Sequence, residues 1–468
     1  MSPDDSRIVF RRGTGIWLMD AAGGQQRQLL AAPPGYYLIE ALAWSPDGSR
    51  IAYGRRSYTG DEFAIETVDL KTGRTNMLLS DPRAGTSGSF CWARDGRIIY
   101  ARLEGPPNEK DSNLWDIRVD PRTAEVRGQP RRLTNWGGFL FGALALSNDG
   151  KRLFSISMSY RSDVYLAELG GGGAPLTARR LSFEEWINRP TGWTRDSQRV
   201  ILYSDRSGEV DIFQQGVNQR EAQATLRSAE DKRDPRLSPD GRWLLYLAWP
   251  KQGRRVRTAE GRLMRVAAGG GTPETVLRVT GYQGLARAEA EGSSPILSAP
   301  GHPRFRCPAV PQSPCVLGEQ AQNQIIFTAF DPAVGRKGEL TRIDVDPYTP
   351  AFWDLSPDGQ WIAFVVREET RGRIRLLSLA GQQAREIPVD GWTHLQYLAW
   401  AADGKALFVT AFASMDPPLL RVSLDGKTHL LYRGHHNLEY PVPSPDGRYL
   451  AFADRNLDGN AWIIENLP

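Results

Sequence analysis

A short turn-forming block recurs along this chain at nearly regular intervals. Its full form is Ser-Pro-Asp-Gly, it becomes ARDG, SNDG, TRDS or AADG elsewhere, and copies begin at Ser45, Ala93, Ser147, Thr194, Ser238, Ser356, Ala401 and Ser444. Successive copies lie 43 to 54 residues apart, except for one interval of 118 residues after Ser238, which is long enough for two periods. A period of this length is what a four-stranded propeller blade requires.

The residues of the block are those that a tight turn needs. Proline fixes φ at about −65°, aspartate accepts hydrogen bonds from the neighbouring backbone, and glycine tolerates positive φ. The third position holds Asp47, Asp95, Asp149, Asp196, Asp240, Asp358, Asp403 and Asp446. Eight carboxylates could also serve as metal ligands or acid–base groups, but a turn position that favours aspartate indicates a structural role.

Short β-rich segments flank each turn. Residues 41–44 precede the first full turn, residues 51–53 follow it, and similar runs occur at 98–100, 114–119 and 200–203. These runs are short and are bounded by Gly, Asp, Asn and Pro, which is typical of strands rather than helices. The predicted fold class is therefore all-β, a β-propeller of four-stranded antiparallel blades.

The repeat unit resembles the TolB-like, WD-repeat-like propellers of bacterial proteins. The resemblance is carried by VILYSDRSGEVDIF at residues 200–213 together with RLSPDG at 236–241, and it covers nearly the whole chain. Residues 133–169 are similar to propeller regions attached to winged-helix regulators and serine/threonine kinases. The resemblance implies a periplasmic or other extracytoplasmic location, although this chain shows no kinase, DNA-binding or membrane segment.

We expect one continuous array of blade units over residues 1–468. The units start near residues 2, 45, 93, 147, 194, 238, 302, 356, 401 and 444, and the divergent unit at 302 is expected to use 305–307, 315–318, 325–330 and 340–345 as strands. Single propellers have about 4–8 blades, so nine to ten units indicate one large ring or one propeller plus part of a second.

The two ends of the array do not complement each other. The first unit lacks its innermost strand and the last lacks its outermost strand, so the two cannot combine into one four-stranded blade. We expect the tail of a two-propeller protein, with an internal boundary that the sequence leaves open.

The composition excludes several other classes. The net charge is +4 and no run of five like charges occurs, so a nucleic-acid partner is not indicated. No segment approaches the about 20 apolar residues that cross a bilayer, and the start, MSPDDSRIVFRRG, lacks the pattern of a secretory signal.

Three cysteines are too few for a scaffold built on disulfides. Cys307 and Cys315 lie close together in a proline-rich segment and could form a disulfide in an oxidising compartment. They could equally be two buried thiols.

Motifs for catalysis or cofactor binding are absent from the sequence. It has no Gly-x-Ser-x-Gly elbow, phosphate-binding loop or dinucleotide fingerprint. The histidines show no metal-binding spacing and are expected in turns or on the surface: His302, His394, His429, His435 and His436.

One weak calcium-type pattern lies near the C-terminus. Asp454, Asn456, Asp458 and Glu465 have the spacing of a calcium loop, with Gly459 at the turn position. Such a loop normally joins two helices, whereas these residues fall in a predicted hairpin over residues 448–467. We therefore expect no cofactor, with calcium as the alternative.

The leading functional hypothesis is a non-catalytic propeller that binds a protein or other ligand through loops at the ends of its channel. It could be the sensor or interaction part of a larger bacterial envelope or regulatory protein. The loops at residues 253–261 and 280–314 are the candidates for contact. The alternative is a propeller hydrolase, or an accessory domain of a peptidase, with carboxylates or histidines gathered in the central channel. The oligomeric state stays open.

Overall fold

The computed structural model describes residues 1–465 except 58–61, 85–88, 106–110, 139, 148, 171–173, 184–185, 208–209, 251–259, 281–302, 312, 322, 346–351, 367–370, 382–383 and 414. All regular structure in these residues is β-strand, arranged in nine antiparallel sheets. No helix within them is long and apolar enough to cross a membrane. The predicted fold class is confirmed.

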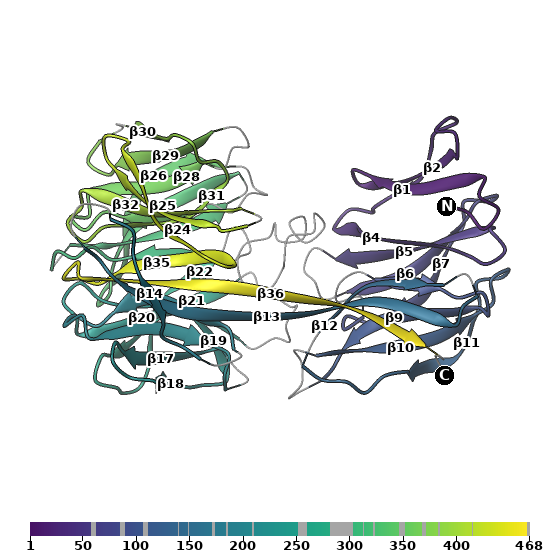
Figure 1. The fold of residues 1–468 in the computed structure, drawn as a ribbon, viewed down its shortest axis with the longest axis horizontal. Coiled ribbons are helices and arrows are strands. Elements are labelled where there is room, and N and C mark those ends of the chain that lie inside the picture. Colours follow the sequence, from purple (N-terminus) through teal and green to yellow (C-terminus); the bar gives the residue numbers. More distant parts are fainter. Residues whose placement is uncertain are drawn as a thin grey trace.

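The first part of the chain forms an open arc of sheets, drawn in purple and blue in Figure 1. Its first sheet has three strands and the next two have four each. The strands are β1 (Arg7–Arg12), β2 (Gly15–Asp20) and β3 (Arg27–Ala31); β4 (Tyr36–Trp44), β5 (Arg50–Ser57), β6 (Phe63–Asp69) and β7 (Thr75–Ser80); and β8 (Phe90–Trp92), β9 (Arg97–Leu103), β10 (Ser112–Val119) and β11 (Val126–Arg132).

The second part forms a closed ring of six blades. Five of them are consecutive four-stranded sheets. Their strands are β15 (Asn188–Trp193), β16 (Arg199–Ser204), β17 (Asp211–Gly216) and β18 (Gln223–Leu226); β19 (Glu230–Leu237), β20 (Trp243–Pro250), β21 (Glu260–Ala267) and β22 (Glu274–Thr280); β23 (Arg304–Arg306), β24 (Cys315–Ala321), β25 (Gln324–Asp331) and β26 (Gly335–Asp344); β27 (Trp353–Leu355), β28 (Trp361–Val366), β29 (Gly372–Ser378) and β30 (Ala384–Val389); and β31 (Leu395–Trp400), β32 (Ala406–Ala411), β33 (Pro418–Ser423) and β34 (Thr428–Arg433).

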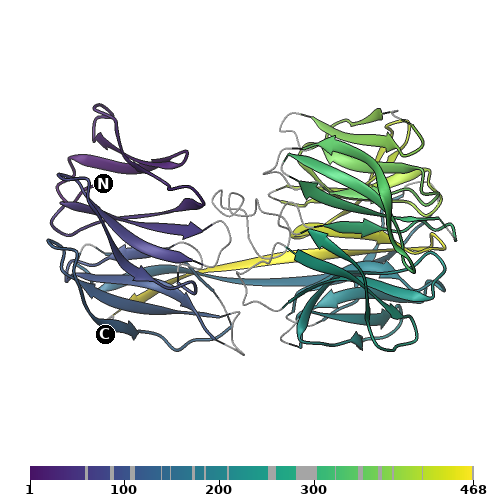
Figure 2. The same cartoon turned by 180° about the vertical axis from the view of Figure 1, so that it is seen from behind.

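One sheet belongs to both the arc and the ring, and we call it the shared sheet. It contains β12 (Leu140–Leu146), β13 (Arg152–Glu168), β14 (Ala178–Arg180), β35 (Asn437–Pro443) and β36 (Tyr449–Glu465). β13 and β36 pair along their whole length, from Arg152 opposite Glu465 to Glu168 opposite Tyr449. Each has 17 residues, about 55 Å when extended, so the two strands run from one body into the other (Figures 1 and 2).

The ring closes by combining strands from two distant segments. β35 pairs with the first half of β36, which pairs with the second half of β13, which pairs with β14. This gives the sixth blade two strands from each segment and removes the exposed sheet edge. The expectation that the first and last units cannot combine into one blade did not foresee this arrangement. The last unit pairs with β13 and β14 instead, and the first unit lies in the arc and not in the ring.

The hairpin predicted over residues 448–467 is wrong. β36 runs through the polar residues Asn456 to Asn460 without a turn, because each of them pairs with a residue of β13. A ladder made with a remote strand therefore overrides a local sequence that favours a turn.

The divergent blade is confirmed, with strands close to those predicted: β23, β24, β25 and β26. Cys307 and Cys315 form a disulfide in it, between the end of β23 and the start of β24. Cys315 is fully buried in the core that this blade shares with the preceding one.

Apolar residues fill the spaces between neighbouring blades. Around the ring, separate cores join each sheet to the next; Val442 of β35 and Trp193 of β15, for example, lie in the core that completes the circle. Three further cores join the four sheets of the arc. Each blade is thus stabilised mainly by the faces it buries against its neighbours.

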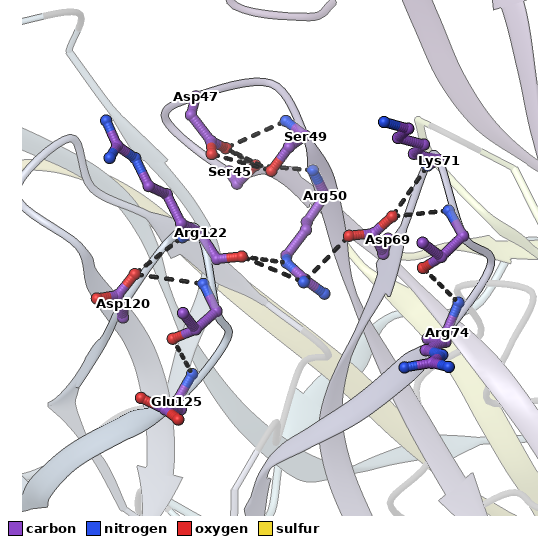
Figure 3. A network of polar contacts seen from close by, with 12 residues as sticks. Ser45, Asp47, Ser49, Arg50, Asp69, Lys71, Arg74, Asp120, Arg122 and Glu125 are labelled. Atoms are coloured by element: carbon purple, nitrogen blue, oxygen red, sulfur yellow. Dashed lines mark hydrogen bonds and ion pairs between the residues drawn. The ribbon is translucent and has the colours of Figure 1, made fainter.

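The repeated turns join the first strand of a sheet to the second, and Figure 3 shows one of them. The Ser45 hydroxyl donates to Asp47 at 2.6 Å, and the Gly48 N–H donates to the Ser45 carbonyl at 2.9 Å with φ at +69°. In all eight copies the aspartate accepts a hydrogen bond from the N–H two residues later. The structural role predicted for these aspartates is confirmed.

Arg50, which follows this turn, links two sheets of the arc. Its guanidinium lies 3.1 Å from Asp69 and donates to the carbonyl of Arg122 in the next sheet, as Figure 3 shows. Asp120 in turn accepts from the N–H of Arg122 at 3.0 Å. The polar contacts at this end of the blades therefore support the scaffold.

Candidate binding site at the propeller axis

The first strand of each ring sheet lies nearest the propeller axis. These strands are β15, β19, β23, β27, β31 and β35, and neighbours such as β15 and β35 contact each other around the axis. Side chains from all six strands, with Phe352 just before β27, form a group that we call the axial cluster: Arg189, Asp234, Arg236, Arg304, Arg306, Phe352, Asp354, Tyr397, Glu439 and Tyr440.

One polar network in the cluster crosses four blades. Arg306 lies between two carboxylates, with Nη1 2.9 Å from Asp234 Oδ2 and Nε 2.8 Å from Asp354 Oδ1. The other oxygen of Asp354 accepts from the backbone N–H of Trp400 on β31 at 2.9 Å. Because charge-assisted hydrogen bonds are strong and directional, this network sets the positions of four first strands relative to one another.

A second network lies where the ring closes. Arg189 Nη2 is 3.1 Å from Glu439 Oε2, and both side chains are buried. Arg455 on β36 reaches the other oxygen of Glu439 at 2.9 Å. Two guanidinium groups share one carboxylate here, so the network carries a surplus positive charge.

Aromatic rings lie between the two networks. The ring of Tyr397 is 4.6 Å from that of Tyr440 and 4.1 Å from that of Phe352. The guanidinium carbons of Arg189 and Arg304 lie 5.0 and 5.9 Å from the centre of the Tyr440 ring, within the range of cation–π contact. Arg304 and Tyr440 stand on opposite blades of the six, so their side chains meet across the axis.

Two residues of the cluster have an unusual backbone conformation. Asp234 and Tyr440 have φ values of 51° and 50°, and each precedes a proline. The strand register shifts at both places, between Arg233 and Arg236 and between Glu439 and Val442. Such bulges re-aim side chains, and positive φ is strained for a bulky residue. Both side chains thereby contact arginines of the divergent blade, Arg306 and Arg304.

The charges of the cluster are not balanced. Burial would raise the pKa of Asp234, but Arg306, Arg236 and Arg304 hold it below its ordinary value. Burial and repulsion by Arg306 lower the pKa of Arg236 to about 10. Four arginines of the cluster face three carboxylates, so the cluster carries a surplus positive charge.

Two arginines on the first strands have no ion-pair partner within the described ranges. Arg304 contacts the rings of Phe352 and Tyr440, and its charge also acts on Asp234 without forming an ion pair with it. Arg233 on β19 lies near Tyr203, where its charge opposes the burial that raises the pKa of that phenol. Guanidinium groups match carboxylates and phosphates in geometry, so these two arginines are suited to bind an anionic group.

The four residues of the calcium-type pattern are spread along one strand. Asp454 and Asp458 lie on one side of β36 with Asn456, whereas Glu465 is about 36 Å from Asp454 along an extended strand. Asp454 lies 3.4 Å from His436 and Glu465 lies 3.5 Å from Arg152. The structure does not gather the four residues around one point, and no group of three His, Cys, Asp or Glu in the described residues is arranged to hold a metal ion.

None of the histidines within the described residues belongs to the axial cluster. His435 and His436 just precede β35, His429 is in β34 and His394 just precedes β31. His302, residues 253–259 and residues 281–302 lie outside the described residues. The proposed contact loops are therefore not placed.

None of the residues of the axial cluster was predicted from the sequence to form a site, although the repeats carry a signal for two of them. Asp234 and Tyr440 each stand before a proline and four residues before the serine of a Ser-Pro-Asp-Gly turn, at Ser238 and Ser444. A charged or aromatic residue at the same point of two repeats, followed by proline, marks a bulged first strand.

Comparison with known proteins gives structures of similar architecture. No family model matches the chain, and no curated protein matches its sequence. Similar solved structures include a putative TolB from Agrobacterium tumefaciens, with 14% identity over 64% of this chain and 99% of that one and a TM-score of 0.47. The TolB of Acinetobacter baumannii has 15% identity over 82% and 64%, with a TM-score of 0.21, and the tricorn protease has 13% identity over 98% and 42%, with a TM-score of 0.29.

The likeness is one of fold. TolB proteins, which the repeats of this chain resemble, are among the similar structures. The similar structures also include peptidases, such as a puromycin hydrolase with 16% identity over 88% of this chain and 57% of that one and a TM-score of 0.31.

Proposed function

We propose that this chain is a non-catalytic binding propeller that receives a carboxylate of a partner protein at the axis of its six-bladed ring. The observation that carries the proposal is the surplus of arginine in the axial cluster, in which Arg304 has no ion-pair partner within the described residues. Arg233, which is next to Asp234 on β19 but outside the cluster, has no ion-pair partner there either. A rigid ring with charged side chains at its centre is suited to recognition.

The pairing of the axial carboxylates favours binding over proton transfer. A general acid or base needs a pKa near the working pH, but Asp234 is held ionised by arginines, Asp354 pairs with Arg306, and Glu439 pairs with Arg189 and Arg455. The hydrolase alternative predicted such a carboxylate cluster at the axis. Here the carboxylates serve to position arginines, and this supports the binding hypothesis.

The aromatic part of the cluster favours a peptide as the ligand. Tyr440 offers a partly exposed ring beside Arg304, and the buried rings of Tyr397 and Phe352 pack next to it. An acidic side chain or a C-terminal carboxylate at the end of a protruding segment could reach the arginines while its neighbours pack on the ring of Tyr440. Free phosphate would satisfy the arginines but gain nothing from the rings.

Isothermal titration of the chain with an acetylated, amidated hexaglutamate peptide tests the proposal. We expect binding that weakens with added salt, no binding of the matching hexaglutamine peptide, and weaker competition by inorganic phosphate. Arg304→Gln and Arg233→Gln should each reduce the affinity about tenfold or more, because a hydrogen bond to a charged group contributes about 1.5–3 kcal/mol.

The matched control is Arg385→Gln, which removes an exposed arginine from β30, the outermost strand of its blade. Its affinity for hexaglutamate should equal that of the unchanged chain. Equal affinity for the two peptides, or an equal loss in all three variants, would contradict a site at the axis.

We also propose that the chain works outside the cytoplasm, as the interaction part of a larger envelope or regulatory protein. The Cys307–Cys315 disulfide supports this location, because cytosolic proteins rarely keep disulfides. Alkylation of the native protein in cell extracts, followed by mass spectrometry, should find both cysteines protected until a reductant is added. Free thiols at both positions would contradict the proposal.

A further inference from the structure

Five of the six ring blades fasten the turn between their first and second strands in the same way. The residue just after the first strand donates its backbone N–H to the carbonyl of the first residue of the second strand, and we call this joined residue pair the turn clasp. The five N···O distances are 2.8–2.9 Å, in the pairs Thr194 and Arg199, Ser238 and Trp243, Ser356 and Trp361, Ala401 and Ala406, and Ser444 and Tyr449. In all but the alanine pair, the N–H of the later residue also donates to the hydroxyl of the earlier one.

The divergent blade has a disulfide at the same two places. Cys307 directly follows β23 and Cys315 is the first residue of β24, and the two are joined covalently. Arg306 and Val316, which flank the pair, lie opposite each other, as the residues that flank the clasp of the next blade do. The sequence between the two cysteines lacks the Ser-Pro-Asp-Gly block. The disulfide therefore takes the place of the turn clasp in this blade.

The strand that the disulfide holds carries two arginines of the axial cluster. β23 has three residues and pairs with β24 through three opposed positions, from Arg304 to Arg306. Phe305 is fully buried in the core shared with the preceding blade, whereas Arg304 and Arg306 reach the axis. A slip of one residue would exchange the two sides of the strand and withdraw both arginines. A covalent bond at the end of so short a strand fixes its register.

The contacts of β23 at the axis depend on its position. The guanidinium of Arg306 lies 2.9 Å from Asp234 and 2.8 Å from Asp354, which belong to the blades on either side. Hydrogen bonds weaken steeply when their angles become unfavourable, so a small displacement of β23 disturbs both contacts. Arg304, at the other end of the strand, moves with it.

We propose that the Cys307–Cys315 disulfide is a positioning element of the axial binding site, so that the site binds its anionic ligand tightly only while the disulfide is intact. The inference rests on the proposed function, because it concerns the same arginines. It adds that the turn at the end of β23 controls the affinity of the site, and that this turn is held by a bond that a thiol can break.

Reduction releases the strand without changing any residue. A dithiol reductant passes two electrons and two protons to the disulfide, which becomes two thiols while the dithiol closes to a cyclic disulfide. Cys307 is partly exposed whereas Cys315 is fully buried, so a reductant can reach the bond at Cys307. The hydrogen-bonded clasps of the other five blades contain no sulfur, so the treatment leaves them intact.

Isothermal titration with the acetylated, amidated hexaglutamate peptide, before and after reduction, tests the inference. We expect reduction to lower the affinity about tenfold or more, as the loss of one hydrogen bond to a charged group would. Hydrogen exchange should become faster in peptides that cover residues 303–307 and stay unchanged in peptides from β31. Cys307→Ser combined with Cys315→Ser should bind like the reduced chain, and a reductant should change it no further.

A grafted turn separates positioning from a general loss of stability. In the grafted chain, residues 307–314 are replaced by the sequence of residues 45–49, and Cys315→Ala removes the second thiol. The graft supplies a hydrogen-bonded clasp without a disulfide, so the grafted chain should bind hexaglutamate as tightly as the oxidised chain, with or without a reductant. Circular dichroism checks that each form is folded. If the reduced chain is not folded, the grafted chain decides the question.

Equal affinity of the oxidised and reduced chains would overturn the inference and leave the proposed function standing. A folded grafted chain that binds no better than the double serine variant would also overturn it, because the disulfide would then contribute something other than the geometry of a turn. If the oxidised chain fails to bind hexaglutamate, the proposed function is wrong and the inference falls with it.

Discussion

The guanidinium carbon of Arg304 lies 5.9 Å from the centre of the Tyr440 ring, although the two residues belong to opposite blades of the ring. The contact spans the propeller axis, so a ligand that reaches the axis meets a cation and an aromatic ring together. Tyr440 holds this place with a φ of 50°, which an aromatic residue rarely adopts. The strain indicates that the position of the ring matters to the function.

Replacing Tyr440 by glycine and by alanine should separate strain from contact. Both variants lose the ring and should bind hexaglutamate more weakly. Tyr440→Gly should nevertheless be more stable than Tyr440→Ala by about 1 kcal/mol, because glycine adopts positive φ without a steric penalty. Urea unfolding of the two variants checks this. Equal stabilities would mean that the strand relaxes when the ring is removed.

Arg306→Met should destabilise the ring by about 3 kcal/mol, because it leaves Asp234 and Asp354 without their common partner. Adding Asp234→Asn and Asp354→Asn should recover part of the loss, since neutral amides need no counter-charge. The measurement is the free energy of unfolding in urea for the single and triple variants. A triple variant less stable than Arg306→Met would contradict the explanation.

Asp240→Ala should lower the free energy of unfolding, and the loss should be largest at neutral pH. Burial opposes the shift, but hydrogen bonds from Ser238 and Arg242 lower the pKa of Asp240 to about 2, below the about 3.9 of an unfolded chain. The contribution of the Asp240 carboxylate to the free energy of unfolding is therefore fully present above about pH 4. It is lost as the pH falls through about 2. The difference in unfolding free energy between the two proteins, about 1 kcal/mol at pH 7, should shrink over that interval. A constant difference would exclude the linkage.

Reduction of the Cys307–Cys315 disulfide should lower the free energy of unfolding by about 2–3 kcal/mol, because the bridge closes a short loop in the unfolded chain. Urea unfolding with and without a thiol reductant measures the loss. The variant with both cysteines changed to serine is the control, and its stability should not depend on the reductant. Cys91 is buried and free, so it should not contribute.

Much of the fold could be predicted because the signals are local. The turn at Ser45 needs only a few consecutive residues to set its hydrogen bonds, and the strands beside it follow from short β-rich runs. Even the divergent blade at β23 to β26 could be predicted from its strand pattern. The course of β36 could not, because its polar middle is held extended by β13, nearly 300 residues earlier.

The axial cluster depends on contacts between residues that are remote in the chain. Arg189 meets Glu439, and Arg306 meets Asp234 and Asp354, only because six blades bring their first strands to one axis. Sequence could mark Asp234 and Tyr440 as unusual through the prolines that follow them, but it could not pair them with arginines of another blade.

By itself the sequence determined the blade: its turns, its four strands and the number of times that it repeats. These features follow from the backbone preferences of the residues and from the alternation of apolar and polar residues within a few tens of positions. The tertiary structure alone decided that the blades divide into an open arc and a closed ring joined by β13 and β36, and that arginines and aromatic rings gather at the axis of the ring. The closure of the ring and the gathering of charges at its axis depend on how the blades pack against one another. These contacts contribute their free energy only when all six blades are in place.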